Sequence, residues 1–157
     1  MYINVISKPS TTITIFSTNA AGLVKGKMDS LISEVKAIKA NIVTIQETHS
    51  MRKGKIIMPE GFVVFEAIRK AKHGGTMCAV HSEPYPKLID IYEDPFEMVV
   101  VEVEANKKRI RIITGSGPQE NWDKVRRMSF FISLESEIIK AELAGKSIIL
   151  EMNFNSK

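Results

Sequence analysis

The 157 residues, 44% hydrophobic and 25% charged, have the composition of an ordinary soluble globular domain that is large enough to bury one core. No run of about 18 apolar residues is present, which excludes a membrane-spanning helix, and the N-terminus lacks the basic and apolar regions of a signal peptide. With a single cysteine, which excludes an internal disulfide, these features predict a cytoplasmic or nuclear protein that is neither secreted nor membrane-bound. The formal net charge of +4 mildly favours a polyanionic partner.

The first third of the chain predicts a strand, a helix and a second strand. Residues 11–16 are β-branched and alternate in polarity, and residues 41–46 form a short apolar run typical of a buried strand. Asn41 can take the left-handed position that ends a helix. Between the two strands we expect a helix over residues 26–40, whose apolar face consists of Met28, Leu31, Ile32, Val35 and Ile38.

The remaining elements predict a strand meander followed by a long helix and a last strand. Short β-rich segments lie at residues 62–66, 76–81, 88–92, 98–104 and 109–114, and the turn at residues 105–108 should join the last two as a hairpin. Residues 147–150 form a buried strand after Gly145 ends the helix. The helix should begin near Asn121 as its N-cap and carry the apolar residues Val125, Met128, Phe131, Ile132, Ile138, Ile139 and Leu143. The fold class is therefore α/β with mixed strands in a single domain.

Polar side chains stand where apolar strands stop, at Asn19, Glu47 and Asn153. Active sites in α/β folds gather at such strand ends. Glu47 closes the strand at residues 42–46, and a carboxylate there can hold Mg²⁺, which prefers oxygen ligands. A strand-end salt bridge or a solvated glutamate is the structural alternative for the same residue.

Five segments, taken together, resemble one family. They are residues 17–23 (Ser-Thr-Asn-Ala-Ala-Gly-Leu), 46–49 (Gln-Glu-Thr-His), 73–75 (His-Gly-Gly), 115–118 (Gly-Ser-Gly-Pro) and 153–156 (Asn-Phe-Asn-Ser). In order and spacing they resemble the motifs of the endonuclease/exonuclease/phosphatase superfamily, and residues 127–131 resemble a helix of its retrotransposon endonucleases. The resemblance implies part of a four-layer α/β sandwich with mixed sheets, over a single domain at residues 1–157 whose C-terminal portion is missing.

The resemblance also implies roles for individual residues in Mg²⁺- or Mn²⁺-dependent cleavage of a phosphodiester. Glu47 would be a metal ligand, Asn19 a second polar contact to metal or phosphate, and Asn155 a contact to the scissile phosphate. Asn153 stands where the family has its catalytic Asp, and an amide cannot accept a proton from water at neutral pH. Ser116 stands in a tyrosine position, so the phenol that would reach the phosphate is lost. The family's final Asp and His motifs lie beyond the position where this sequence stops. These departures and the missing motifs predict weak or absent hydrolysis.

Two basic loops can form a rim that follows a phosphate backbone, although solvated loops have the same composition. One contains Arg52, Lys53 and Lys55, and the other contains Arg69, Lys70 and Lys72, followed by His73 as a phosphate contact. The single tryptophan, Trp122, is expected to pack at a helix start rather than to stack on a base.

Three functions remain open on the sequence alone. The first is a metal-dependent nuclease acting on nucleic acid, with DNA favoured over RNA. The second is a binding module that keeps the fold without turnover, and the third is a phosphatase acting on a small phosphoester. We also expect either a homo-oligomer or a partner chain that supplies the missing part of the family fold.

Overall fold

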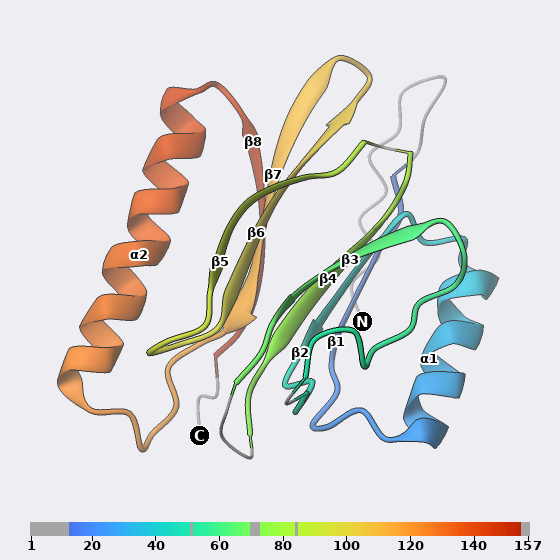
Figure 1. Cartoon of the computed structure of the whole chain (residues 1–157). Helices are drawn as coiled ribbons and strands as arrows, with labels where there is room; N and C mark the ends of the chain where they lie inside the picture. Colours follow the sequence, from blue (N-terminus) through green and yellow to red (C-terminus); the bar gives the residue numbers. More distant parts are fainter. Residues whose placement is uncertain (1–12, 51, 70–72, 84, 155–157) are drawn as a thin grey trace.

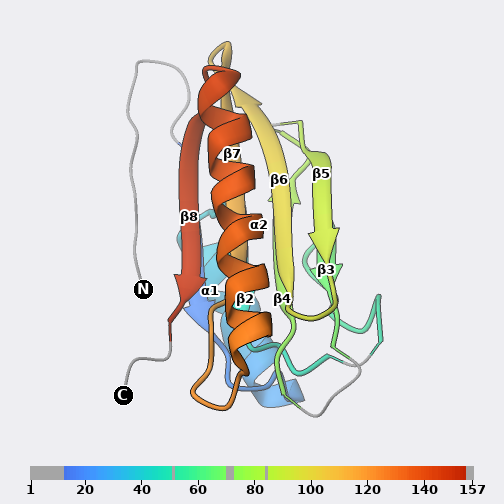
Figure 2. The same ribbon diagram turned by 90° about the vertical axis from the view of Figure 1, so that its left-hand side faces the viewer.

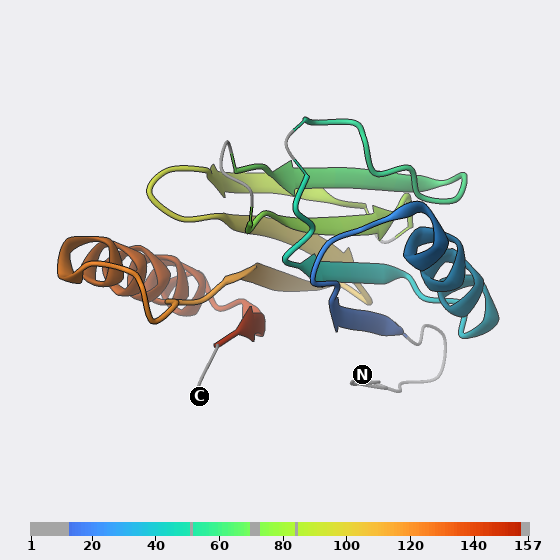
Figure 3. The same cartoon turned by 90° about the horizontal axis from the view of Figure 1, so that it is seen from below.

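The protein folds into two four-stranded sheets that pack face to face, with one helix on the outside of each sheet (Figures 1 and 3). This computed structural model describes residues 13–154 except residue 51, residues 70–72 and residue 84. The elements are β1 (Ile15–Asn19), α1 (Lys25–Ala37), β2 (Ile42–Gln46), β3 (Phe62–Ala67), β4 (Thr76–His81), β5 (Lys87–Tyr92), β6 (Met98–Ala105), β7 (Lys108–Ser116), α2 (Lys124–Leu143) and β8 (Ser147–Asn153). The predicted four-layer α/β architecture with mixed sheets is confirmed. No helix within the described residues is long and apolar enough to cross a membrane.

The first sheet has the strand order β1-β2-β4-β3 and contains the predicted strand-helix-strand unit. β1 and β2 are parallel, with Asn19 opposite Gln46, and α1 is the crossover between them. All five residues of β2 are buried, as expected for a central strand covered on both faces.

The second sheet has the order β5-β6-β7-β8, and its centre is the predicted hairpin of β6 and β7. Asn106 and Lys107 form the turn, both with positive φ, and these two residues lie between the paired residues Ala105 and Lys108. α2 connects β7 to the parallel strand β8 and covers the outer face of this sheet (Figure 2).

Apolar side chains from both sheets meet in the middle layer, where Ile15, Ile42 and Val80 pack with Val99 and Val101. Cys78 belongs to the same cluster and is fully buried, so it acts as a small hydrophobe, as the sequence predicted. Burial raises the pKa of its thiol to about 12, which makes it unreactive as a nucleophile.

The start of α2 differs from the sequence prediction. Asp123, not Asn121, is the N-cap, and its side chain accepts a hydrogen bond from the Arg126 backbone N–H at 2.7 Å. Six of the seven apolar residues that the sequence places on this helix are exposed, namely Val125, Met128, Phe131, Ile132, Ile139 and Leu143. The buried side is Phe130, Leu134, Glu137 and Ala141. Apolar residues therefore lie on more than one side of α2, and Glu137 interrupts the apolar pattern of the packed side.

α1 also ends earlier than predicted, at Ala37 rather than at residue 40. Lys39, not Asn41, takes the left-handed conformation after the helix, with φ +53°. The Asn41 side chain instead accepts a hydrogen bond from the Thr14 backbone N–H at 2.9 Å, and so ties the start of β2 to the chain before β1.

Candidate functional site

The carboxyl ends of the parallel strand pairs from both sheets lie at the same end of the sandwich (lower end of Figure 1). β1 ends at Asn19 opposite Gln46, and β8 ends at Asn153 opposite Ser116. Glu47 follows β2 directly. The fold therefore brings residues from the two ends of the sequence to one edge of the molecule.

Glu47 and Asn153 contact each other across the two sheets. The Asn153 Nδ2 group donates a hydrogen bond to Glu47 Oε1 at 2.9 Å, and both side chains are half-buried. An ionised carboxylate only accepts hydrogen bonds, so the amide must present its nitrogen to Glu47 and not its oxygen. The asparagine thus occupies the position beside Glu47 where the motif comparison expects an aspartate.

The backbone around Glu47 is held in an uncommon conformation. Glu47 has φ +52°, its carbonyl accepts from the Gly22 N–H at 2.8 Å, and the Thr48 N–H donates to the Gly75 carbonyl at 3.2 Å. Gly75 has φ +82°, and a Cβ there would lie 2.6 Å from Thr48 Oγ1, so only glycine fits. The Gly-Gly motif therefore supports the Glu47 loop by close backbone approach.

Buried polar side chains next to Glu47 form hydrogen bonds that link the two sheets. This link was not predicted from the sequence. Gln46 Nε2 donates to Thr114 Oγ1 at 3.0 Å, and Thr76 Oγ1 donates to the Ile45 carbonyl at 3.1 Å. Gln46, Thr76 and Thr114 are all buried. Polar residues within otherwise apolar strands were the available signal, since buried polar groups need partners.

Asn19 is exposed, and its Oδ1 accepts a hydrogen bond from the Ala21 backbone N–H at 3.0 Å. This contact forms a local turn after β1 and occupies one lone pair of the oxygen. Its role as a metal ligand stays a prediction.

Ser116 is 2% exposed, and its Oγ has no hydrogen-bond partner among the described residues. The Gly117 N–H donates to the Asn153 carbonyl at 2.8 Å, which fixes this strand end beside Asn153. Asn155, the predicted phosphate contact, lies outside the described residues.

Two histidines lie beside the Glu47 loop. The rings of His49 and His73 meet edge to face with centroids 5.0 Å apart. Burial lowers the pKa of His49, and repulsion from His73 adds to this, while Glu47 opposes it. His49 is therefore held toward its neutral form, in which it can both donate and accept a hydrogen bond.

The two basic loops are less available for phosphate than the sequence suggested. Lys53 Nζ lies 3.0 Å from Glu93 Oε1, and Arg69 Nε lies 3.4 Å from Glu97 Oε1. Arg52 is exposed. Lys72 lies outside the described residues. The predicted rim therefore consists partly of ion-paired cations.

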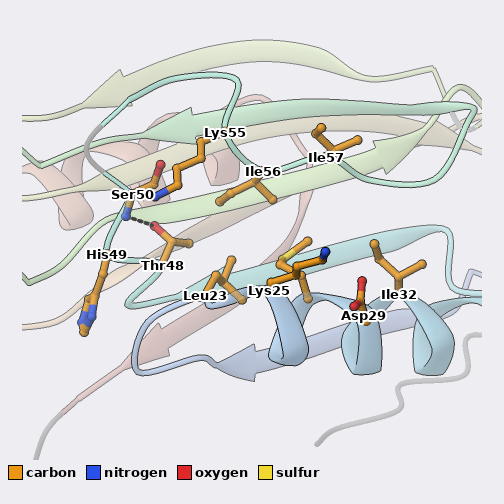
Figure 4. A pocket seen from close by; sticks show the side chains of 11 residues that line it. Leu23, Lys25, Asp29, Ile32, Thr48, His49, Ser50, Lys55, Ile56 and Ile57 are labelled. Carbon is orange, nitrogen blue, oxygen red and sulfur yellow. Dashed lines mark hydrogen bonds between the residues drawn. The ribbon is translucent and has the colours of Figure 1, made fainter.

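A cavity of about 370 Å³ lies between α1 and the loop after β2 (Figure 4). Its walls are largely apolar, including Leu23, Ile32 and Ile56, with Thr48 and Ser50 at one end. Figure 4 shows the His49 ring at the edge of the cavity, pointing away from the isoleucines.

The strand ends offer a divalent cation one carboxylate, that of Glu47. No group of three or more His, Cys, Asp or Glu side chains that could hold a metal occurs among the described residues. Mg²⁺ commonly binds through one or two carboxylates and completes its shell with water and substrate phosphate. Glu47 supplies one such carboxylate, so the site fits Mg²⁺ or Mn²⁺ only with substrate and water as further ligands.

Solved structures of other proteins share this fold at low sequence identity. The human Nocturnin catalytic domain matches with a TM-score of 0.69 and 11% identity, over 92% of this chain and 64% of that one. The Neisseria 3′ phosphatase NExo, bound to product DNA hairpin, matches with a TM-score of 0.61 and 16% identity, over 90% of this chain and 57% of that one. The endonuclease domain of TRAS1, a telomere-specific non-LTR retrotransposon, matches with a TM-score of 0.59 and 19% identity, over 91% of this chain and 59% of that one.

The sequence comparisons gave no further match: no protein-family model matches the sequence, and no curated protein matches it. The chain spans 48% to 67% of the length of the TDP2 structures first matched to it. The matched structures belong to one superfamily although each is below 20% identical to this chain. The chain therefore has the fold of the endonuclease/exonuclease/phosphatase superfamily, which the sequence motifs predicted.

Proposed function

We propose that this protein is a divalent-metal-dependent phosphodiesterase of the nuclease type that acts on nucleic acid, with a hydrolytic step weakened by Asn153. The observation that carries the proposal is the 2.9 Å hydrogen bond from Asn153 Nδ2 to Glu47 Oε1. It joins Glu47, the expected metal ligand, to Asn153, which stands in the catalytic-aspartate position, and the two are 106 residues apart in the sequence.

Glu47 would hold the metal, with Asn19 as a second contact. A bound Mg²⁺ or Mn²⁺ would polarise the phosphoryl oxygens of the substrate. Asn153 holds the Glu47 carboxylate in place but cannot take a proton from an attacking water, because its amide is not basic. Burial holds the pKa of His49 below its usual value, and its neutral imidazole beside the Glu47 loop could accept a proton.

Nucleic acid is the favoured substrate, and DNA is favoured over RNA. Two matched structures contain DNA products, one a single strand bound to zebrafish TDP2 and the other a hairpin bound to NExo. The exposed Arg52 offers positive charge to a phosphate backbone, whereas Lys53 and Arg69 are ion-paired with Glu93 and Glu97.

A binding module without turnover is the second candidate. The amide of Asn153 favours it, since the position of the proton-accepting group is filled by a hydrogen-bond donor. The two candidates share the nucleic-acid surface and differ in whether the bound phosphodiester is cleaved.

The test is hydrolysis of an end-labelled single-stranded DNA in Mg²⁺ and in EDTA. We expect slow Mg²⁺-dependent cleavage by the natural protein and none by Glu47→Gln, while Glu135→Gln, an exposed control on α2, cleaves like the natural protein. Binding of the DNA with no cleavage at any metal concentration would favour the binding module. Cleavage by Glu47→Gln at the natural rate would remove Glu47 from the site.

A further inference from the structure

A second cavity, of about 520 Å³, lies at the same end of the molecule, between the end of β3, the loop joining β5 to β6, and the start of α2. Figure 2 shows the β5–β6 loop and the N-terminal end of α2 together at the lower end of the second sheet. The charged side chains that line the cavity are Arg69, Glu93, Asp94, Glu97 and Arg126. Its volume is in the usual range for pockets that bind small ligands.

Glu97 is the least expected residue in this cavity. It is 1% exposed, and neither of its carboxylate oxygens accepts a hydrogen bond from the described residues. Arg69 Nε is 3.4 Å from Oε1, an ion pair without hydrogen-bond geometry. Burial raises the pKa of Glu97, opposed by the attraction of Arg69 and Arg126. A buried carboxylate without hydrogen-bond donors is costly, and a bound ligand with donors would offset that cost.

Arg126 is the second unsatisfied group. Its guanidinium lies 3.9 Å above the Trp122 ring, and its Nε is buried without a hydrogen-bond partner among the described residues. Stacking on Trp122 fixes the plane of the guanidinium and leaves its N–H groups as donors at the cavity wall. The cavity thus offers a carboxylate acceptor together with two guanidinium donors.

The charges around the cavity favour a neutral ligand. Arg69 and Arg126 stand beside three carboxylates, of which Glu93 is also paired with Lys53. The three basic and three acidic groups balance, so a phosphate would gain little by entering. A nucleobase is neutral and carries both donors and acceptors.

The cavity adjoins the Glu47 loop. The His49 N–H donates to the Gly74 carbonyl at 2.8 Å. On the other side of this glycine, a Cβ built at Gly74 would lie 3.2 Å from a Glu97 oxygen. When a nucleic acid binds at Glu47, a neighbouring nucleotide can therefore reach the cavity.

We infer that this cavity binds an unpaired guanine base of the nucleic-acid substrate, with Glu97 accepting from its N1–H and N2–H groups and Arg69 or Arg126 donating to O6 or N7. Guanine is the base whose Watson–Crick edge has two adjacent donors, which match the two oxygens of a carboxylate. Its O6 and N7 acceptors are the usual partners of arginine. The inference rests on the proposed function, because it deepens the substrate class of the same site.

The test is fluorescence anisotropy with labelled oligothymidylate strands in EDTA, so that no cleavage occurs. One strand carries a single deoxyguanosine, a second carries deoxyinosine at that position, which lacks the N2 amino group, and a third is all thymidine. We expect the guanine strand to bind roughly tenfold to a hundredfold more tightly than the all-thymidine strand, as a bidentate base contact does, and inosine to lose most of that gain.

Glu97→Gln should remove the advantage of guanine and keep the affinity for oligothymidylate. Glu104→Gln, a change of the same kind on an exposed residue at the opposite end of β6, should keep the advantage. Equal affinity of the natural protein for the guanine and inosine strands would overturn the inference even if Glu97→Gln failed to fold. Binding of oligothymidylate without a guanine advantage would overturn the base pocket alone, whereas no binding of any strand, either in EDTA or in Mg²⁺, would overturn the proposed function as well.

Discussion

Asn153→Asp should destabilise the protein when no divalent metal is present. The substitution removes the donor that satisfies Glu47 at 2.9 Å and places a second carboxylate at that position. Loss of a hydrogen bond to a charged group costs about 1.5–3 kcal/mol. Like charges at this separation add to the cost, although protonation of one carboxyl relieves part of it. Because both side chains are half-buried, we expect a total of about 2–4 kcal/mol in EDTA at neutral pH.

Mg²⁺ should reverse part of this loss, because two adjacent carboxylates form a better site for a hard cation than one. A metal concentration tenfold above its dissociation constant would restore roughly 1.4 kcal/mol. Urea unfolding followed by circular dichroism, in EDTA and in Mg²⁺, measures both effects. Asn121→Asp, the same change at an exposed position, should alter neither value. An unchanged free energy of unfolding for Asn153→Asp in EDTA would show that the two side chains do not face each other.

Three further changes have definite outcomes. Arg111→Met should lower the free energy of unfolding by about 3–5 kcal/mol in urea, because it leaves Glu102 and the buried Glu137 without their arginine. Gly75→Ala should lower the thermal midpoint and weaken Mg²⁺ binding in calorimetry, since its Cβ would lie 2.6 Å from Thr48 Oγ1. Burial raises the pKa of Glu102, but hydrogen bonds from Lys146 and Arg111 outweigh this effect, so the pKa is lowered. The stability that Glu102 contributes is therefore present at neutral pH and is lost as the pH falls through the pKa of the folded state. Urea unfolding of Glu102→Gln and the natural protein should therefore differ at pH 7 and converge in acid.

Most strands could be predicted from the sequence because their apolar runs are short and bounded by turn residues. Two predictions were wrong: the first strand was expected at residues 11–16 but β1 is Ile15–Asn19, and the last was expected to be buried but β8 has no buried residue. The segment at residues 76–81 coincides with β4, and the turn at Asn106 and Lys107 identified the hairpin of β6 and β7. Their pairing across the sandwich is a tertiary property, and no local pattern indicated that Gln46 and Thr114 would meet.

The packed side of α2 could not be predicted, because exposed apolar residues outnumber the buried ones. Phe130 and Leu134 face the sheet together with Glu137, which accepts a hydrogen bond from the Tyr92 hydroxyl at 2.7 Å. A pattern of polarity predicts that a glutamate faces solvent. Only the buried residues that contact Glu137 show that it is buried. α2 also has an exposed apolar side. The expected homo-oligomer or partner chain stays a prediction.

Motifs in the sequence named part of the candidate site, and the catalytic and metal-binding roles of those residues stay predictions. Glu47 and Asn153 follow from the motifs, and the structure brings them together. Glu97 was missed although it precedes an apolar strand much as Glu47 follows one. An acidic residue at a strand boundary is ambiguous until its burial is known, since most such residues are solvated.

Cleavage of supercoiled plasmid DNA in Mg²⁺ by the natural protein and by Asn153→Asp measures whether the amide of Asn153 weakens a phosphodiesterase site at Glu47. If Glu47 and Asn153 form a phosphodiesterase site weakened by the amide, restoring the carboxylate supplies the missing proton acceptor and strengthens the metal site. General base catalysis contributes typically 10²–10⁴-fold, so we expect nicking to rise by roughly a hundredfold or more and to vanish in EDTA. Equal nicking by the two proteins, or a rise that persists in Asn153→Asp combined with Glu47→Gln, would contradict the account.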